Sequence, residues 1–232
     1  MRDKIVSLMP YEGRRVASKY LSKGWFQELQ ESRSNETGYS CFSFLKTKSI
    51  FVHIPKAAGI SINNALYGTM GFAHAAVKDY QLVFSKNEFN DFFKFTIVRN
   101  PWDRMYSAYT FLKKGGINEY DEKFGQKLPD SFEETVLEWL TPVSATSYYH
   151  FIPQTYFLRS YTGKELCVDF IGRFENLEED FEKIKERVNI SAKLEHKNQT
   201  KKGSYKDVYS KRMINKVADI YRTDIELLKY SF

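Results

Sequence analysis

Three short runs of apolar, β-branched and aromatic residues are the clearest hydrophobic pattern in this 232-residue chain. The first covers residues 49–54 and ends at Pro55, and the second covers residues 93–98. Residues 168–174 form a similar run. Short runs of this composition are typical of strands that are buried on both faces, so we predict a strand at each position.

Helical spacing of apolar residues follows the first two runs. We expect one helix from Gly59 to about Met70, and a second that opens at Asn100 and Pro101, a favourable pair for the N-cap and the first helical position. One face of the second helix carries Trp102, Met105, Tyr106, Tyr109 and Leu112. Strands that alternate with helices predict an α/β fold around a mainly parallel central sheet flanked by helices.

Further helices are indicated elsewhere in the chain. Ser131 with Glu134, and Asn176 with Glu179, have the spacing of an N-terminal capping box. We also expect a helix around residues 15–31. A last helical stripe consists of Ile214, Val217, Ala218 and Tyr221.

The domain organisation follows from length and from the absence of repeats or low-complexity linkers in the sequence. We expect one domain, residues 49–232, preceded by an N-terminal extension, residues 1–48, that packs on it. Hydrophobic residues make up 42% of the chain and aromatic residues 16%, which excludes a disordered protein.

The charge balance is moderately basic, with 35 Lys and Arg against 29 Asp and Glu and a net charge of +6. The excess favours anionic partners, but it is scattered along the chain, so we do not expect nucleic acid as a partner. A solvated basic surface without any partner is the alternative. Nothing in the sequence indicates an oligomeric state.

Cysteine usage and hydropathy bear on the compartment. Cys41 and Cys167 are far apart and outside any C-x-x-C pattern, which argues against a zinc site or a disulfide framework and favours a reducing compartment. The N-terminus has no signal-peptide core, and the uncharged stretches 57–77 and 139–158 are too polar for a membrane helix. We therefore expect a cytoplasmic protein without a transmembrane segment.

Small residues separate the first strand from the next helix. Such a loop exposes backbone N–H groups, and the helix N-terminus adds partial positive charge, so the two together favour a phosphate group. It is not a Walker A loop, because the lysine precedes the glycine. An ordinary strand–helix turn is the alternative. The candidate phosphate-binding residues are Lys56, Ala57, Ala58, Gly59, Ile60 and Ser61.

A second candidate segment begins after the second strand. Arg99 lies at the carboxyl end of that strand, where ligands bind in open α/β sheets. Ser107 falls two turns along the next helix, so one phosphate can contact both residues, and the planar guanidinium matches phosphate oxygens. For Arg104 we expect an ion pair with a neighbour such as Asp103 or Glu133.

Together, these segments resemble the two cofactor motifs of PAPS-dependent sulfotransferases, in particular the branch of carbohydrate sulfotransferases and their bacterial relatives. Residues 54–61 match I-P-K-x-A-G-x-S, which binds the 5′-phosphosulfate, and residues 99–109 match R-N-P-x-x-R-x-x-S-x-Y, which binds the 3′-phosphate. Ala57 and Ile60 replace the hydroxyl residues common there, which puts a hydroxyl contact in doubt. The resemblance implies a P-loop-like three-layer sandwich and PAPS (3′-phosphoadenosine 5′-phosphosulfate) as cofactor.

The resemblance extends over residues 49–232. Residues 151–158 look like the family's P-Q-x-x-F-L segment, residues 170–177 like its I-G-R-F-E-N-L strand, and Tyr221 with Asp224 like its closing helix. A basic loop falls where the family closes over the nucleotide, although a solvated turn is the alternative. Its candidate cofactor-binding residues are Lys201, Ser204 and Tyr205.

The resemblance implies sulfuryl transfer to an acceptor hydroxyl, in which positioning and charge stabilisation dominate. We expect Lys56 to stabilise charge during the reaction. A general base must remove the acceptor's proton, and His74 lies about where relatives place a histidine. His150 or a carboxylate such as Glu133 is the alternative base, whereas we expect His53 to be structural.

The expected acceptor is a saccharide or glycolipid hydroxyl, and no metal site is expected. Two other functions stay open from the sequence. One is an atypical P-loop kinase, which the missing Gly-Lys-Ser/Thr motif disfavours. The other is a nucleotide-binding module that has lost catalysis, which the substitution at Ala57 would support.

Overall fold

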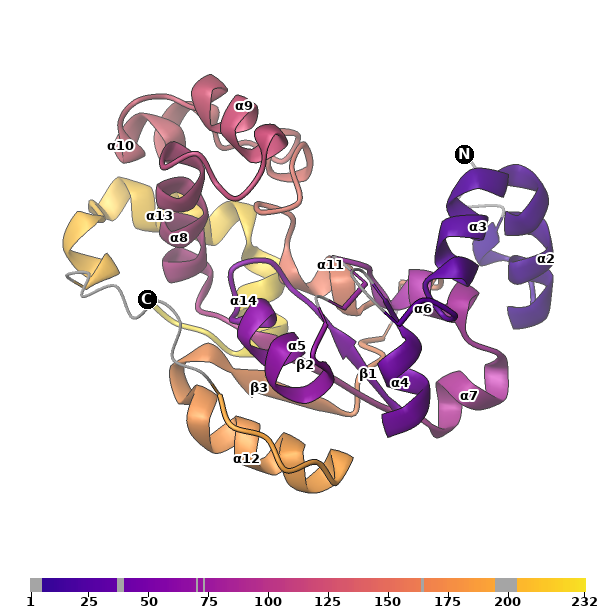
Figure 1. Cartoon of the computed structure of the whole chain (residues 1–232). Helices are drawn as coiled ribbons and strands as arrows, with labels where there is room; N and C mark the ends of the chain where they lie inside the picture. The colour runs from indigo at the N-terminus through magenta and orange to yellow at the C-terminus, as the bar shows by residue number, and fades with distance from the viewer. Residues whose placement is uncertain (1–5, 37–39, 70, 73, 164, 195–203) are drawn as a thin grey trace. The chain divides into compact units, whose positions relative to one another are not determined.

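The structure is a computed structural model (Figure 1), and it describes residues 6–36, 40–69, 71–72, 74–163, 165–194 and 204–232. The chain forms two compact units, each assembled from separate stretches of sequence. Unit 1 consists of Met1–Ile54, Ala58–Val98 and Tyr156–Lys197. Unit 2 consists of Pro55–Ala57, Arg99–Thr155 and Asn198–Phe232. The expected division into an extension, 1–48, and a domain, 49–232, stays a prediction.

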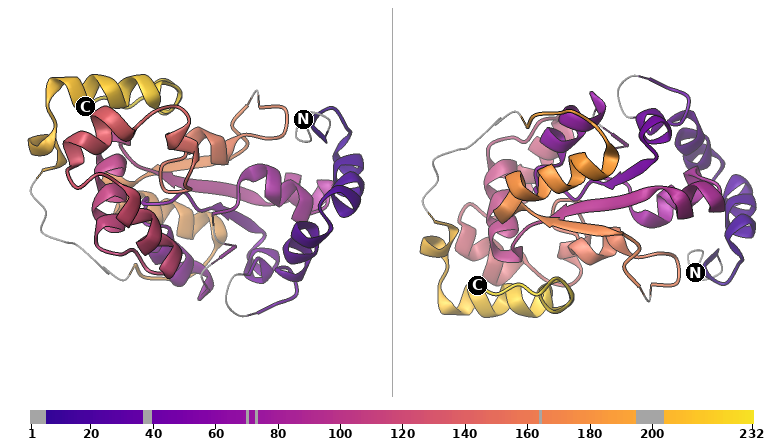
Figure 2. Two further views of the ribbon diagram at one scale, coloured as in Figure 1. Left: turned by 90° about the horizontal axis from the view of Figure 1, so that it is seen from above. Right: turned by 90° about the horizontal axis from the view of Figure 1, so that it is seen from below.

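Unit 1 contains a parallel sheet whose strands lie side by side in Figures 1 and 2. Within the described residues its order is β1 (Ser49–Val52), β2 (Phe93–Val98) and β3 (Phe170–Arg173). β2 pairs in parallel with both neighbours. All three predicted strands are present, although β1 and β3 are shorter than expected. The predicted α/β fold with a central parallel sheet flanked by helices is therefore confirmed.

Helices of unit 1 pack along this sheet: α12 contacts β2 and β3, and α4 contacts β1. The helix expected to reach Met70 ends at Tyr67, because Gly68 adopts a left-handed conformation with φ of 64°. The helices of this unit are α2 (Tyr11–Leu21), α3 (Lys23–Glu31), α4 (Phe42–Thr47), α5 (Gly59–Tyr67), α6 (Val77–Val83), α7 (Lys86–Asp91), α12 (Leu177–Val188) and the short η3 (Phe174–Asn176). Helix α11 (Gln154–Leu158) begins in unit 2 and ends in unit 1.

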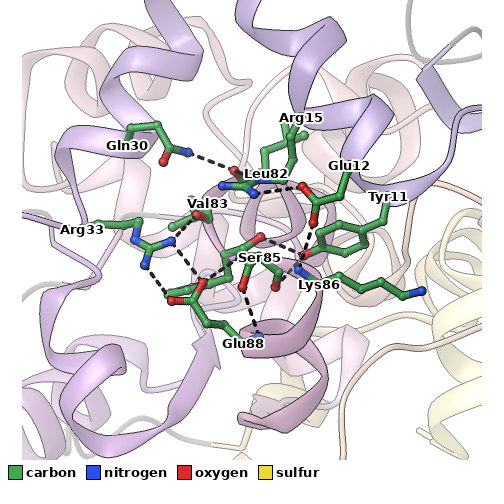
Figure 3. Close-up of polar contacts among 11 residues, drawn as sticks. Tyr11, Glu12, Arg15, Gln30, Arg33, Leu82, Val83, Ser85, Lys86 and Glu88 are labelled. Carbon is green, nitrogen blue, oxygen red and sulfur yellow. Dashed lines mark hydrogen bonds and ion pairs between the residues drawn. The ribbon is translucent and has the colours of Figure 1, made fainter.

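The prediction of one helix at residues 15–31 is wrong, because two helices meet there. Ser22, with φ of −146° and ψ of 50°, leaves the helical region and separates α2 from α3. Both helices form polar contacts with the segment around α6 and α7 (Figure 3). Gln30 Nε2 donates to the Leu82 carbonyl at 2.9 Å, and Arg33 pairs with Glu88 at 2.7 Å.

Unit 2 is built from helices around a core of aliphatic and aromatic side chains. The elements are α8 (Pro101–Lys113), α9 (Glu119–Lys127), α10 (Phe132–Glu134), η1 (Thr135–Trp139), η2 (Ser144–Thr146), η4 (Tyr205–Val208), α13 (Lys211–Ile220) and α14 (Arg222–Leu228). Both predicted stripes supply this core, with Trp102, Met105 and Leu112 from the first and Val217 and Tyr221 from the last. Since these side chains lie at helical spacing, burying one face of each helix brings them together.

Helix ends test the capping predictions. The Asn100 side chain accepts from the Trp102 N–H at 3.1 Å, and Ser131 with Glu134 forms a complete capping box. Asn176 does precede α12, but its side chain makes no capping hydrogen bond, so that capping box is wrong. Within the described residues, no helix combines the length and the apolar character needed to cross a membrane.

Candidate active site

The segment between β1 and α5 adopts an unusual backbone conformation. Lys56 and Ala58 have φ of 67° and 62°, in the left-handed region that non-glycine residues rarely adopt. Ala58 is the N-cap residue of α5 and provides no side-chain acceptor for the first turn. The N–H groups at the start of α5 therefore receive no cap from this residue, which suits them to an external anion.

Gly59 begins α5 in unit 1, and the His53 ring leaves no room for a side chain there. A Cβ at this position would lie 1.7 Å from His53 Cδ2. The His53 ring is buried and stacks on Phe51 with a centroid separation of 5.8 Å. Its Nδ1 lies 3.5 Å from Asn63 Nδ2. These contacts support the expected structural role of His53, which packs the start of α5 against the end of β1.

His74 lies beside His53 in the same unit, with ring centroids 4.4 Å apart. Its Nδ1 is 3.2 Å from the His53 carbonyl oxygen. A carbonyl oxygen can only accept, so in the neutral imidazole Nδ1 holds the proton and Nε2 is the basic nitrogen. His74 is half-buried, and Nε2 is the nitrogen through which it would act as a base.

In unit 2, Arg99 and Lys56 come together although they are 43 positions apart. Arg99 Nη1 donates to the Lys56 carbonyl at 3.0 Å, and Arg99 Nε donates to Asp103 Oδ2 at 2.7 Å. The Arg99 side chain is largely buried in this arrangement. Within unit 2, the guanidinium therefore contacts the backbone of Lys56, one residue of the first predicted cofactor motif.

Gln154 holds the backbone of Arg99 from the other side. Its Oε1 accepts from the Arg99 N–H at 2.9 Å, and its Nε2 donates to the Arg99 carbonyl at 2.8 Å. Asp224 in turn accepts from the N–H groups of Gln154 and Thr155 at 2.6 and 2.9 Å. Burial raises the pKa of Asp224, while the hydrogen bonds from Thr155 and Gln154 oppose that rise. Asp224, Gln154, Arg99 and Lys56 form a continuous chain of contacts.

Neither Gln154 nor Asp224 was among the site residues predicted from the sequence. Both occur in segments that resemble the family, the first in P-Q-x-x-F-L and the second in the closing helix. That resemblance was the available signal, but it carries no indication that the side chains meet. They lie 70 positions apart, and each is fully buried.

Arg104 does not form the expected ion pair; Arg99 pairs with Asp103 instead. Arg104 Nε donates to the Pro55 carbonyl at 3.0 Å, and its Nη2 donates to the carbonyls of His150 and Ile152 at 3.1 and 2.8 Å. The side chain is only 2% exposed. The helix turns Arg104 inward toward two backbone segments, one at Pro55 and one at His150–Ile152, and carbonyls replace the carboxylate as partners.

The Lys56 ammonium lies over the face of the Phe111 ring, 3.4 Å from its centroid. Such cation–π contacts stabilise a charge that is partly removed from water. Phe111 in turn meets the His150 ring edge-on, with centroids 5.0 Å apart. An aromatic residue on α8, outside both sequence motifs, thus positions the candidate catalytic lysine.

A buried carboxylate organises the aromatic residues behind Phe111. Asp121 Oδ1 accepts from the hydroxyls of Tyr148 and Tyr149 at 2.6 and 2.8 Å and from His150 Nε2 at 3.2 Å. Burial alone would raise the pKa of Asp121, but these hydrogen bonds lower it, and the net shift is downward. His150 is only 5% exposed, which favours a structural role over contact with an acceptor.

The remaining predicted residues lie on separate elements. Ser107 is half-buried on α8, and its carbonyl accepts from Thr110 Oγ1 at 3.3 Å. Ser204 Oγ accepts from the Lys206 N–H at 3.3 Å and caps η4. Tyr205 packs edge-on against Phe232, with centroids 5.8 Å apart. Lys201 falls outside the described residues. All of these assignments stay predictions.

Comparison with known proteins places this geometry in a family. Residues 42–231 match the model of the family described as "Sulfotransferase family". A protein of Archaeoglobus fulgidus, described only as uncharacterized, is 32% identical over 111 residues, which cover 47% of this chain and 78% of the relative. No solved structure is significantly similar to the chain. Since the match covers most of the sequence, including both cofactor motifs, the chain belongs to the sulfotransferase family, whose activity is the transfer of a sulfuryl group to an acceptor hydroxyl.

Proposed function

We propose that this protein uses PAPS as the sulfuryl donor and a saccharide or glycolipid hydroxyl as the acceptor, in the cytoplasm. The observation that carries the proposal is the hydrogen bond from Arg99 Nη1 to the Lys56 carbonyl, at 3.0 Å. Both residues belong to unit 2, Lys56 as part of the 5′-phosphosulfate motif and Arg99 as part of the 3′-phosphate motif. A 3′-phosphorylated donor is the ligand that would engage both motifs at once.

The residues present fit such a donor. Lys56 supplies a cation, Gly59 has no side chain, and the first turn of α5 lacks a cap from Ala58. Backbone N–H groups and a lysine are suitable partners for phosphate and sulfate oxygens. The residues that would hold the donor are Lys56, Ala57, Ala58, Gly59, Ile60, Ser61, Arg99, Ser107, Lys201, Ser204 and Tyr205.

When bound, PAPS supplies the sulfuryl group and leaves as adenosine 3′,5′-bisphosphate. Lys56 contributes positive charge from a side chain that lies on Phe111, while Arg99 holds the backbone carbonyl of Lys56. His74 Nε2 removes the proton of the acceptor hydroxyl, since Nδ1 is directed to the His53 carbonyl. Positioning by pre-arranged groups is the main contribution that the chain makes to the reaction.

Donor binding can be tested without an acceptor. Adenosine 3′,5′-bisphosphate should raise the melting temperature in the absence of magnesium, and it should do so much less in Lys56→Met. The matched control is Lys114→Met, because Lys114 is an exposed lysine of the same unit. Ser107→Ala should reduce the preference for the bisphosphate over AMP, which lacks the 3′-phosphate. A requirement for ATP with magnesium would contradict the proposal.

Turnover requires labelled PAPS and a panel of oligosaccharides, glycolipids and phenols. We expect label transfer to at least one saccharide-bearing acceptor. His74→Ala should lower kcat by about 10² to 10⁴, the usual contribution of general base catalysis, with bisphosphate affinity unchanged. His150→Gln is the comparison for the alternative base. Full activity of His74→Ala would remove His74 from the mechanism.

One observation favours a second candidate, a donor-binding module without catalysis. Ala57 is buried and provides no hydroxyl where the family commonly has one. Backbone donors would retain affinity there even if charge stabilisation were weaker. Tight bisphosphate binding together with no transfer to any acceptor in the panel would support this module over the enzyme.

A further inference from the structure

The N-terminal helices α2 and α3 precede the part of the chain that matches the family, which begins at residue 42. Both nevertheless contact α6 within unit 1, and α6 begins three positions after His74. We call residues 6–36 the N-terminal segment. Its contacts lie on both sides of His74 along the chain, so this segment bears on where the candidate base is held.

The end of α6 is held by polar side chains of the N-terminal segment. Arg15 Nε and Gln30 Nε2 donate to the Leu82 carbonyl at 3.3 and 2.9 Å. Arg33 Nη1 donates to the Val83 carbonyl at 2.9 Å (Figure 3). The last carbonyls of a helix have no partner within that helix. The N-terminal segment therefore satisfies the carbonyl end of α6.

Before His74, an aromatic contact joins α3 to the chain. Trp25 packs on Phe72, with ring centroids 5.7 Å apart and ring planes inclined at 45°. Phe72 is buried and lies two positions before His74. Leu29, one turn further along α3 than Trp25, is fully buried, so both residues belong to the inner face of this helix. Trp25 is still 41% exposed, so replacing its side chain does not open the core.

Backbone hydrogen bonds tie the end of α3 to the same part of the chain. The Cys41 N–H donates to the carbonyl of Ser32, the residue that follows α3, at 2.8 Å. The neighbouring Ser40 N–H donates to the Gly71 carbonyl at 3.1 Å. Gly71 has φ of 65°, and a Cβ at this position would lie 2.6 Å from Asn63 Oδ1 of α5. The backbone at Gly71 is therefore tied to α3 and packed against α5.

His74 lies between two fixed points of the chain, Phe72 and Ala76. The Ala76 N–H donates to Asp79 Oδ2 at 2.8 Å, at the start of α6. The contact of His74 Nδ1 with the His53 carbonyl, at 3.2 Å, orients the ring only while the backbone stays in place. General base catalysis requires a heavy-atom separation of about 2.6–3.2 Å, so a displaced backbone would remove the base from its target.

We propose that the N-terminal segment positions His74 for removal of the acceptor's proton, and that Trp25 is the positioning residue, acting through Phe72. The proposal rests on the proposed function, because it takes His74 as the base. Arg15, Arg33 and Trp25 are each partly exposed, so this attachment can shift without unfolding unit 1. Its contacts lie within unit 1, so a shift there should impair proton removal and spare the lysine and arginine contacts of unit 2.

Steady-state kinetics with labelled PAPS and a responding acceptor give the first test. Trp25→Ala should lower kcat by about 10- to 100-fold, since a misplacement of about 1 Å can cost about 10² in rate. The affinity for adenosine 3′,5′-bisphosphate should stay unchanged. Trp25→Phe keeps an aromatic ring against Phe72 and should restore kcat to within about twofold of the wild type. The matched control is Tyr20→Ala, an aromatic residue of α2 that is 76% exposed, which should change neither quantity.

A second measurement needs neither PAPS nor an acceptor. The chain has four histidines, so nitrogen NMR of isotope-labelled imidazoles is practicable, and His74→Ala identifies the His74 signals. In alkaline solution, where an ordinary histidine is neutral, the wild type should carry the His74 proton on Nδ1. Trp25→Ala should shift these signals toward the average of the two tautomers, whereas Trp25→Phe and Tyr20→Ala should not. Melting temperatures should stay close to the wild type, since the altered side chains are exposed.

The proposal requires both the loss of kcat and the shifted His74 signals in Trp25→Ala, with both restored in Trp25→Phe. Either change without the other would overturn it, and so would a loss of bisphosphate affinity equal to the loss of kcat, since Trp25 would then have only a structural role. Failure of the proposed function looks different: His74→Ala keeps full activity, or the wild type transfers no label. In that case the NMR measurement alone decides whether Trp25 positions His74.

Discussion

Two regions of this molecule use arginine to hold a helix, and they do so in opposite environments. In unit 1, Arg33 on the segment after α3 pairs with Glu88 of α7, and both side chains are about one quarter exposed. In unit 2, Arg104 on α8 is only 2% exposed and donates to three backbone carbonyls. Water and salt ions can therefore compete for the Arg33–Glu88 pair, whereas they do not reach the hydrogen bonds of Arg104.

This difference in burial predicts how well each region tolerates substitution of its arginine. A partly exposed ion pair contributes little net free energy, because water solvates both partners once it breaks. A buried guanidinium satisfies carbonyls that no solvent can reach, so its loss leaves several acceptors without partners. We therefore expect the region around Lys56 and Arg99 to be rigid, and the attachment of α2 and α3 to be adjustable.

The largest effect is expected for Arg104→Met, which keeps the apolar stem but removes all three donors. The carbonyls of Pro55, His150 and Ile152 would be left unsatisfied in a buried site. The free energy of unfolding should fall by about 3 kcal/mol or more, measured by urea denaturation. Arg33→Met is the matched control, with an expected loss of no more than about 1 kcal/mol. Equal losses of stability in the two variants would contradict the proposed difference between the buried and the partly exposed arginine.

Asp224→Asn should have the next largest effect. Asp224 now accepts hydrogen bonds from the N–H groups of Gln154 and Thr155. In the variant, the amide nitrogen is itself a donor and would face one of these N–H groups. A loss of about 2 kcal/mol in the free energy of unfolding is expected. Because Gln154 holds Arg99, bisphosphate binding by calorimetry should weaken as well. Lower stability with unchanged affinity would show that the chain of contacts does not reach the donor site.

A smaller effect is expected for Phe111→Leu, which removes the aromatic face under the Lys56 ammonium. A cation–π contact contributes about 0.5–1 kcal/mol at such a site, so the affinity for adenosine 3′,5′-bisphosphate should fall by about two- to fivefold. Phe111→Tyr keeps the ring and should preserve the affinity. If leucine and tyrosine bind the bisphosphate equally well, the ring does not position Lys56.

The smallest effect is expected for Glu88→Gln in unit 1. Burial acts to raise the pKa of Glu88, but hydrogen bonds from Arg33 and Ser85 lower it below the ordinary value of 4.5. A carboxylate whose pKa is lower in the folded state stabilises the fold above that ordinary value, and the stabilisation is lost as pH falls through the lowered value.

At pH 7 the Glu88→Gln variant should lose no more than about 1 kcal/mol in the free energy of unfolding, and less at high salt. Denaturation curves measured between neutral and acidic pH should converge for the wild type and the variant. A difference that persists at acidic pH would contradict the assigned role of the carboxylate.

Much of the fold was predictable because its signals are local. The strands at residues 49–52, 93–98 and 170–173 arise from continuous apolar runs, and Asn100 with Pro101 specifies the start of α8. Local rules failed at Ser22, where the chain leaves the helical region despite helical spacing on either side. They also failed at Asn176, whose position before α12 did not bring its side chain onto the helix end.

The candidate site was predictable only in part. Lys56 and Arg99 were identified from motifs, but their direct contact depends on the fold. The ion pair expected for Arg104 is formed by Arg99, because α8 directs Arg104 into the core and Asp103 toward Arg99, which precedes the helix. No sequence motif marks Asp121 or Phe111. Only the folded structure shows that Asp121 is buried and that one of its oxygens accepts from three side chains.

By itself, the sequence determined the parallel α/β class, the order of its strands along the chain, and the family, since periodicity and short motifs record interactions between near neighbours. The tertiary structure decided which distant groups meet. Asp224 reaches Gln154 across 70 positions, and Arg104 reaches Ile152 across 48. Such pairs form because buried polar groups require partners, and the chain's packing, not its local pattern, decides which partners lie within reach.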